Sequence, residues 1–471
     1  MAHVKCVFFV LRYLNRSASV KKLFKTLKNI WSIEELRSKI LFTLALVFIY
    51  RIGAHIVLPG IDPETISQSM QKSKGGILGL IDTFAGGAFS QASIFALGIM
   101  PYISASIFMQ LMTVLVPQMQ KLQKEGDSGR KKINQWTRYL TVLVTLVQAS
   151  AYVTYLNQMT QNGGRIPGFE NYFWYTTVII LTAGTLFVMW LGEKITDKGL
   201  GNGTSLIIMV GILARLPQSF VQEFVARSTG GGAGGGILIF IIEVFILIGI
   251  ILGCILLIQG TRKIALNYAK QIAGGNRQFT GARQFLPIKV NSAGVMPIIF
   301  AQAIMFLPTL FSYSNSDTGK GIGKIFSNHQ NMWYMIVYST VVIGFTFLYT
   351  ALIFNPKQIA DNLKQNNGFI PGVKPGQPTA DYIGAVMDKV TLPGAVLLAF
   401  VGILPGLVQV AGLVQTQAFA NFFGGTSLLI MVGVILDTLQ QIETQLLMRQ
   451  YDGLMKSGRI QGRQTLTQAS V

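Results

Sequence analysis

The residues that could do chemistry are few and scattered. The sequence has no HExxH zinc motif, no GxSxG nucleophile turn and no GxxxxGK(S/T) phosphate loop. The three histidines, His3, His55 and His329, lie far apart, and neither Cys6 nor Cys254 belongs to a CxxC or CxxH pattern. We therefore expect no catalytic residue, no metal site and no cofactor, so the energy for any work must come from a partner or a gradient.

Acidic residues inside apolar sequence are the remaining candidates. Glu243 lies in the run IIEVF, and Asp437 and Glu443 follow the last apolar stretch. An intramembrane carboxylate costs ~2.5–3.5 kcal/mol on insertion scales, so each needs a reason to be there. Ion transporters pair several such groups, whereas Glu243 stands alone in its run. We expect a structural hydrogen bond or a contact with a partner helix, with an ion site as the alternative.

The composition indicates a membrane protein. Of 471 residues, 51% are apolar and only 12% are charged, about half the charged fraction of a soluble domain. Ten apolar runs approach the ~20 residues that a transmembrane helix needs. The runs are 40–57, 92–116, 139–159, 172–191, 206–220, 237–258, 293–311, 332–354, 392–412 and 422–436.

The net charge of +20 is unevenly distributed between the loops. With a cytosolic N-terminus, 30 of the 39 cationic residues fall on the inner side and seven, including Arg215 and Arg227, fall in outer loops. The positive-inside rule therefore predicts that both termini are cytosolic. The run 6–11 is too short for a signal peptide, so we expect the first span to stay uncut. The basic inner face either attracts anionic lipids or docks an acidic protein or RNA.

Two predicted cytosolic loops, 259–291 and 355–390, each exceed thirty residues, whereas connections of ~4–6 residues are usual. The first has no acidic residue and interleaves cations with aromatic residues, which suits a phosphate backbone or an acidic protein surface. The second contains PGVKPGQP at 371–378 and is expected to form an ordered hairpin-like projection rather than a helix.

A glycine-rich segment and a pair of isoleucines could take part in opening and closing a path through the membrane. Segment 75–91 is too glycine-rich for a robust helix, and is either a movable element or an inert re-entrant loop. Ile99 and Ile103 are four residues apart on one helix face, with Pro101 between them weakening the backbone ladder. The pair either lines a dry constriction or simply packs.

Six segments closely resemble the SecY family, the channel subunits of bacterial protein-conducting translocons. They are GIMPYISAS (98–106), GNGTSL (201–206), LPIKVNSAGVMP (286–297), NPKQIADNLK (355–364), GFIPGVKPG (368–376) and FGGTSLLI (423–430). The resemblance implies an all-α membrane protein with ten transmembrane helices in two inverted pseudosymmetric halves, 40–228 and 229–446, around an hourglass pore. Segment 1–39 and tail 447–471 would be cytosolic.

The resemblance also implies site residues. Ile99, Ile103, Ile208, Ile299 and Ile430 match the family's pore ring. Segment 75–91 resembles the plug, with Ile77, Leu80, Ile81, Phe84 and Phe89 as its apolar residues. A lateral gate would open between runs 92–116 and 139–159 on one side and runs 293–311 and 332–354 on the other, with Gln110 and Gln302 as polar gate residues.

The implied function is the passage of unfolded secretory polypeptides across the inner membrane and the sideways release of transmembrane segments into lipid. A signal sequence would open gate and plug, without enzymatic activity in this chain. The implied partners are SecE, SecG, the SecA ATPase, the ribosome, signal sequences, nascent polypeptides and membrane lipids. SecA or the ribosome would dock on the long loops through Arg262, Lys263, Lys270, Arg277, Arg283, Lys357 and Lys374.

The sequence departs from the family pattern in two places. Lys374 stands where the family usually has arginine, so bidentate pairing with a motor carboxylate is lost while the charge is kept. The resemblance begins only near Val20, and we expect residues 1–19 to come from an upstream start, with translation beginning at Val20.

Two other classes of protein compete with this interpretation. A secondary solute transporter would share the spans and the inverted repeats but needs a polar site at the membrane midplane, where this chain offers isoleucines. An intramembrane enzyme would need a nucleophile, a base or metal ligands within the spans.

Overall fold

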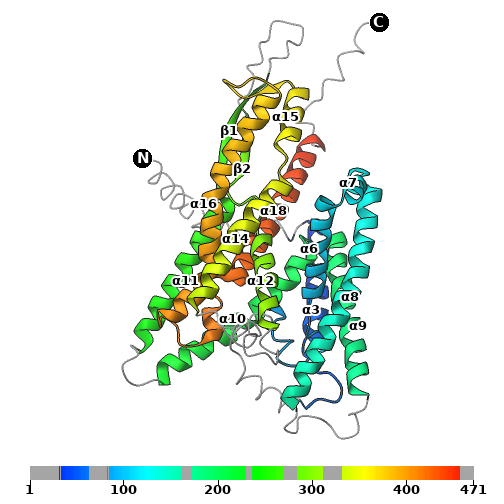
Figure 1. The fold of residues 1–471 in the computed structure, drawn as a ribbon, viewed down its shortest axis with the longest axis vertical. Helices are drawn as coiled ribbons and strands as arrows, with labels where there is room; N and C mark the ends of the chain where they lie inside the picture. Colours follow the sequence, from blue (N-terminus) through cyan, green and yellow to red (C-terminus); the bar gives the residue numbers. More distant parts are fainter. Residues whose placement is uncertain are drawn as a thin grey trace. The chain divides into compact units, whose positions relative to one another are not determined.

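The computed structural model describes residue 31 and residues 33–62, 82, 84–160, 172–229, 236–268, 284–310 and 331–456 (Figure 1). Several sequence predictions lie outside these residues. They are the extension 1–19, plug residues Ile77, Leu80 and Ile81, and loop cations Lys270, Arg277 and Arg283.

Within the described residues, each of the ten predicted apolar runs contributes a long helix. These helices are α3 (Glu34–Gly53), α6 (Met100–Leu115), α8 (Asp127–Thr160), α9 (Phe173–Lys198), α10 (Gly203–Thr229), α11 (Gly236–Gln259), α12 (Met296–Leu310), α14 (Met332–Ile353), α16 (Gln377–Val410) and α18 (Gly425–Lys456). Shorter helices are α7 (Pro117–Lys124), α15 (Pro356–Gln365) and α17 (Gln417–Ala420).

Seven of the described helices are long and apolar enough to cross a membrane: α8, α9, α10, α11, α14, α16 and α18. The pair α6 and α7, bent by 101°, counts as an eighth span if it is taken as one. Helix α11 shows the chemistry most clearly, because all its residues except Glu243 and Gln259 are apolar or glycine, and it nevertheless exposes Leu238 and Phe245. Such a helix fits contact with lipid. The helical membrane fold is confirmed, and the full count of ten spans stays a prediction.

Two compact units make up the chain, one of residues 1–52, 190–206 and 434–471 and the other of residues 53–189 and 207–433. In the first unit, the turn between α9 and α10 is fixed by two side chains. Thr43 Oγ1 accepts a hydrogen bond from the Leu200 amide at 3.1 Å, and Gln441 Oε1 accepts one from the Gly201 amide at 2.9 Å. Side chains of α3 and α18 thus hold Leu200 and Gly201, at the start of the segment GNGTSL.

Helix α6 begins at Met100, eight residues later than the predicted run, so the prediction of a helix from residue 92 is wrong. Residues 85–92 and 94–99 form successive turns, and Ser93 between them pairs with Val57 in an isolated β-bridge. Ala92 and Gly98 have φ of +46° and +55°, which is incompatible with a continuous right-handed helix. Pro101 lies in the first turn of α6, where its missing N–H has no helical partner to lose. Pro101 therefore starts the helix and does not break it.

The prediction that 355–390 is not helical is also wrong. Asn355 caps α15 by accepting a hydrogen bond from the Gln358 amide at 3.3 Å, and Pro356 follows at the first helical position. These are standard signals of a helix start. Helix α16 then begins at Gln377, well before the apolar run at 392, so the turn-forming sequence occupies only the short connection between the two helices.

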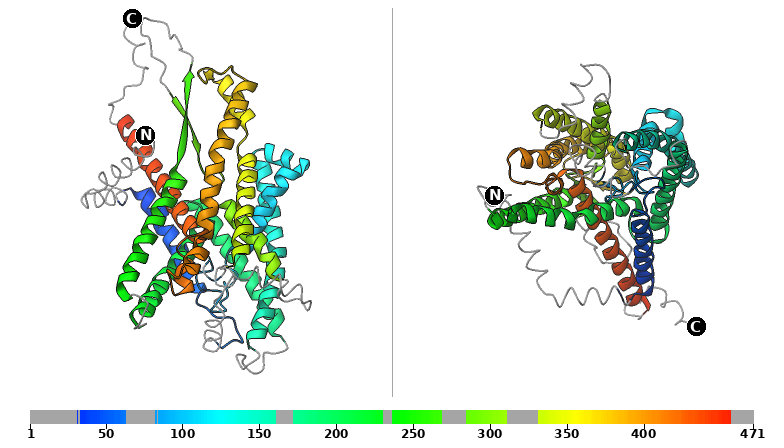
Figure 2. Two further views of the ribbon diagram at one scale, coloured as in Figure 1. Left: turned by 60° about the vertical axis from the view of Figure 1, so that its left-hand side comes forward. Right: turned by 90° about the horizontal axis from the view of Figure 1, so that it is seen from below.

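A small antiparallel sheet, which the sequence analysis did not anticipate, joins the two long loops, with two strands from the first loop and one from the second. Its strands are β1 (Thr261–Tyr268), β2 (Gln284–Lys289) and β3 (Gly368–Phe369), in the order β2-β1-β3. Figure 2 shows β1 and β2 side by side. Their antiparallel register places Ile264 opposite Leu286. Ile264, Leu266 and Ile288 pack against residues of α15 and α16. The sheet therefore gives the basic loop a folded base.

Candidate functional site

An apolar seam joins helices α6, α12 and α14. Its buried members are Ile107, Ala293, Phe300 and Tyr349, and Ile103, Leu111, Ile299 and Phe345 pack against them. The Phe300 ring lies 5.3 Å from the Phe345 ring and 5.2 Å from the Tyr349 ring, measured between centroids. The aromatic rings therefore tie α12 to α14, while the isoleucines bring α6 against both.

One polar contact crosses the seam between α6 and α14. The Tyr349 hydroxyl donates a hydrogen bond to Gln110 Oε1 at 2.9 Å. Gln110 is one of the two predicted gate residues. The other, Gln302 of α12, lies on a cavity that is also lined by Tyr338 of α14 and by residues of α16 and α18. The structure thus places the two glutamines in different surroundings.

The five predicted ring residues lie in one compact unit and on four elements. Ile99 precedes the first turn of α6, Ile103 lies within α6, and Ile208, Ile299 and Ile430 lie on α10, α12 and α18. The Ile103 amide donates to the Ile99 carbonyl at 3.1 Å, so these two side chains are one helical turn apart. Ile103 and Ile299 each pack against the buried residues of the seam, whereas Ile99, Ile208 and Ile430 are almost fully buried.

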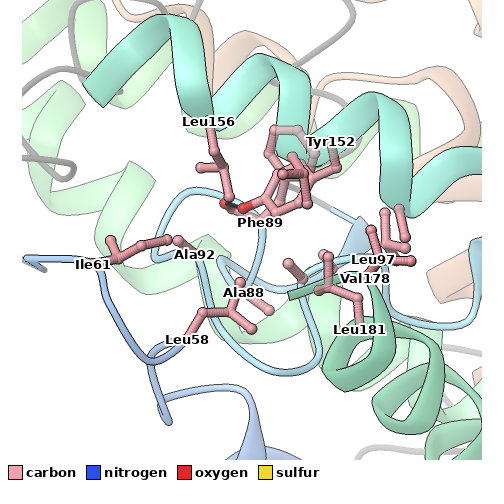
Figure 3. Close-up of a cluster of buried hydrophobic side chains, with 14 of the residues drawn as sticks. Leu58, Ile61, Ala88, Phe89, Ala92, Leu97, Tyr152, Leu156, Val178 and Leu181 are labelled. Atoms are coloured by element: carbon pink, nitrogen blue, oxygen red, sulfur yellow. Dashed lines mark hydrogen bonds between the residues drawn. The ribbon is translucent and has the colours of Figure 1, made fainter. Parts of the chain in front are cut away.

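The turn segment 84–99 is packed tightly against α8 and α9 (Figure 3). Phe89 lies against Tyr152 with ring centroids 4.7 Å apart, and the Tyr152 hydroxyl donates to the Phe89 carbonyl at 2.8 Å. Small side chains allow this close approach, because Ala88, Ala92 and Ala96 are completely buried. Segment 84–99 is therefore held by packing although it is not helical.

Two arginines that the sequence analysis assigned to outer loops lie in α10: Arg215 falls within the predicted run 206–220, and Arg227 falls in the nine residues by which the helix extends beyond it. Arg215 forms an ion pair with Asp82, and Arg227 forms ion pairs with Glu223 and Glu243. Glu243 is therefore not alone: its cation comes from the preceding helix, and the structural contact that we preferred is the one observed. The i, i+4 spacing of Glu223 and Arg227 was a visible signal of this cluster.

The four predicted docking cations that the structure describes, Arg262, Lys263, Lys357 and Lys374, are all exposed. They lie on β1, on α15 and in the connection before α16, and their charges are accessible to a partner. Among the described residues, no group of three or more histidine, cysteine, aspartate or glutamate side chains is arranged to hold a metal ion.

The fold is that of protein-conducting channels. The solved structure described as "The structure of a protein conducting channel" has a TM-score of 0.61 at 16% identity, covering 87% of this chain and 92% of that one. A structure of canine Sec61 in a ribosome-channel complex has a TM-score of 0.57 at 16% identity, with coverage of 87% and 92%. At this identity the likeness shows the fold alone.

The sequence comparisons identify the family. The SecY family model matches residues 93–439. Protein translocase subunit SecY of Mycobacterium tuberculosis is 40% identical over 446 residues, 90% of this chain and 97% of its own length. The same subunit of Escherichia coli is 39% identical over 434 residues, 91% and 96% of the two chains. The chain belongs to the SecY family.

Family membership fixes the class of function. The chain is a membrane channel subunit of a protein translocase and not an enzyme. This finding disfavours the secondary solute transporter, and it agrees with the apolar character of the residues predicted for the pore.

Proposed function

We propose that the chain forms the central pore of the translocon, with the seam of α6, α12 and α14 as its lateral gate. The observation that carries this proposal is the seam itself, an apolar interface closed by a single described side-chain hydrogen bond, from Tyr349 to Gln110. A signal sequence of ~20 apolar residues offers these helices an equivalent apolar surface. It can therefore part them at little cost and shift the channel toward the open state.

The constriction of this pore is the ring of Ile99, Ile103, Ile208, Ile299 and Ile430. Isoleucine side chains offer no hydrogen bonds, so the ring tolerates any passing side chain and excludes water and ions when empty. The two inverted halves, 40–228 and 229–446, would move apart as polypeptide enters.

The plug is segment 75–91. Its described part supports the role, because Phe84 and Phe89 are buried among helices of the channel. The remaining apolar plug residues, Ile77, Leu80 and Ile81, belong to the same proposal.

The gate is tested by removing its cross-seam hydrogen bond. Tyr349→Phe deletes the hydroxyl and keeps the ring, which removes ~0.5–1.5 kcal/mol of closing energy. Export of a substrate with a weakened signal sequence should rise about two- to tenfold at that energy, measured as processed product per minute. Tyr338→Phe is the matched control on the same helix, since the buried Tyr338 hydroxyl has no described hydrogen-bond partner. Equal export from both variants would contradict the gate.

The basic loops are the docking surface for the ribosome and for SecA. The exposed charges of Arg262 and Lys263 on β1 and of Lys357 and Lys374 near it support this role, because rRNA phosphates and acidic protein surfaces attract such groups. Canine Sec61 is described in a ribosome-channel complex. We extend that partnership to this chain.

Charge reversal tests the docking surface. Arg262→Glu with Lys263→Glu should weaken co-sedimentation with ribosomes by at least tenfold at ~0.15 M salt and flatten the salt dependence, since two phosphate contacts become repulsive. Lys131→Glu with Lys132→Glu, two exposed residues of α8, is the control with the same change in net charge. An equal loss in the control would mean that ribosomes respond to overall charge and not to this loop.

The remaining features of the proposal concern the setting of the channel. The chain lies in the bacterial inner membrane with both termini in the cytosol, as the excess of inner cations supports. SecE clasps the two halves and SecG lies at the periphery. Membrane lipids surround the spans and receive transmembrane segments from the gate.

A further inference from the structure

Arg215 of α10 binds the glycine-rich turn from Asp82 to Ser90, which lies in the proposed plug segment 75–91. Arg215 Nη2 donates to Asp82 Oδ2 and, at 2.6 Å, to Ser90 Oγ. Both charged side chains are largely shielded, with 16% of Arg215 and 11% of Asp82 exposed. The ion pair therefore joins two segments that are 133 residues apart in the sequence.

Asp82 also organises the turn that Arg215 grips. Its Oδ1 accepts a hydrogen bond from the Ser90 amide at 2.8 Å, and its backbone carbonyl accepts one from the Gly87 amide at 2.9 Å. Asp82 thus closes the loop from residue 82 to residue 90. Releasing Arg215 from Asp82 and Ser90 frees this loop as one piece.

The turn lies directly under the guanidinium. Gly87 has φ of +94°, and a Cβ atom placed there would lie 2.8 Å from Arg215 Nε. One turn back along α10, a Cβ atom on Gly211 would lie 2.7 Å from the Phe84 carbonyl oxygen. Gly211 and Arg215 share a helix face with the predicted ring residue Ile208, because their spacing is i, i+3 and i+7. This face of α10 therefore leads from the ring to the plug.

The Arg215 contacts are incomplete in one respect. Arg215 Nε is buried and has no hydrogen-bond partner among the described residues. A buried donor without an acceptor destabilises the docked state. The ion pair thus holds the turn, while the unpaired Nε donor lowers the stability of the docked state.

We infer that Arg215 and Asp82 form a latch that keeps the plug docked on α10, and that opening the channel requires this ion pair to break. The latch rests on the proposed role of segment 75–91 as the plug. It acts on the resting state, since a passing polypeptide displaces the whole turn. Loss of either charge should therefore favour the open state without removing the pathway for translocation.

The test uses the full translocase reconstituted in liposomes. Arg215→Met and Asp82→Asn should each raise the ion conductance without substrate by about tenfold, within the range that couplings between contacting residues produce. Arg215→Asp combined with Asp82→Arg should return the conductance toward the original value. Gln218→Leu is the control on α10, because exposed Gln218 accepts a hydrogen bond from Arg215 at 3.3 Å and makes no described hydrogen bond to the turn.

The outcomes separate the latch from the plug. If deletion of residues 75–91 raises the conductance but both single variants match the control, the latch is wrong and the plug stands. If the deletion changes nothing, the plug itself is wrong. If the conductance of the exchanged variant, Arg215→Asp with Asp82→Arg, equals the combined increase of the two single variants, the effect comes from lost packing and the latch is overturned. Transport of an intact secretory substrate, measured in the same liposomes, shows that each variant is assembled.

Discussion

Replacing Arg227 by methionine is expected to remove most of the folded protein. Arg227 Nη2 donates to Glu243 Oε1 at 2.6 Å and to the Leu413 carbonyl at 2.9 Å, and Arg227 Nε lies 3.3 Å from Glu223 Oε1. The three charged side chains are at most 5% exposed. Methionine keeps the aliphatic volume but leaves two buried carboxylates without a cation.

Glu223 makes this cluster a junction of three parts of the fold. It accepts hydrogen bonds from the Gln415 amide at 3.0 Å, from the Thr416 amide at 2.8 Å and from the Thr416 hydroxyl. The cluster therefore joins α10, α11 and the connection between α16 and α17. Removing one partner of a buried ion pair costs ~3–5 kcal/mol. This is comparable with the whole stability of many domains, ~5–15 kcal/mol.

The measurement is the yield of monodisperse protein in detergent and the midpoint of its thermal unfolding. Glu243→Gln is the matched variant, because it keeps an oxygen for Arg227 and removes the second negative charge, and we expect it to cost ~1 kcal/mol or less. Arg227→Met unfolding at the same temperature as Glu243→Gln would show that the cluster does not stabilise the fold.

The second large effect concerns the proposed pore ring. Ile103→Asn combined with Ile299→Asn should raise the resting ion conductance by about a hundredfold, because each isoleucine would contribute ~1.5–3 kcal/mol of hydrophobic free energy to the proposed dry constriction. Asparagine has nearly the same length but binds water, so the ring becomes wet.

Both residues also pack at the seam. The control must therefore distinguish an increase in conductance caused by hydration of the ring from one caused by weaker helix packing. Ile304→Asn serves this purpose, because Ile304 lies on α12 and is 39% exposed. Conductance is measured on planar bilayers with the assembled translocase. A double variant that folds and transports substrate but conducts no better than Ile304→Asn would exclude these residues from the barrier.

The centres of the helices were predictable from sequence, and their ends were not. Hydropathy locates the apolar part of a helix, but α16 begins with the polar sequence QPTADY, whose helical state depends on packing against α14 and α15. Likewise, Ala92 to Gly98 is apolar yet non-helical, because its backbone follows the surfaces of α8 and α9. An apolar sequence indicates that a segment is excluded from water. Burial of a non-helical turn in the protein core excludes water as well as contact with lipid does.

The sheet was missed although its signal was present. In TRKIALNY the buried residues Ile264 and Leu266 alternate with exposed Lys263 and Ala265, which is the period of a strand. The loop is strongly basic, which indicates a docking surface and not a strand. An alternation that involves only two apolar residues is a weak signal for a strand.

The long-range polar contacts could not be derived from local pattern. Tyr349 and Gln110 are 239 residues apart, and Arg215 and Asp82 are 133 apart. No periodicity relates such positions, because the fold alone brings them together. The family resemblance pointed to the segments that we propose as gate and plug, whereas these side-chain pairs came from the structure.

Photocrosslinking from position 103 tests the central claim most directly. A photoreactive amino acid replaces Ile103, and a secretory substrate is arrested midway through the assembled translocase. The account predicts adducts to the substrate during arrest and none before translocation starts, while a probe at position 336, which is half exposed on α14, gives none at either stage. Absence of adducts from position 103 while the substrate is shown to be arrested across the membrane would contradict the claim that polypeptides pass this ring.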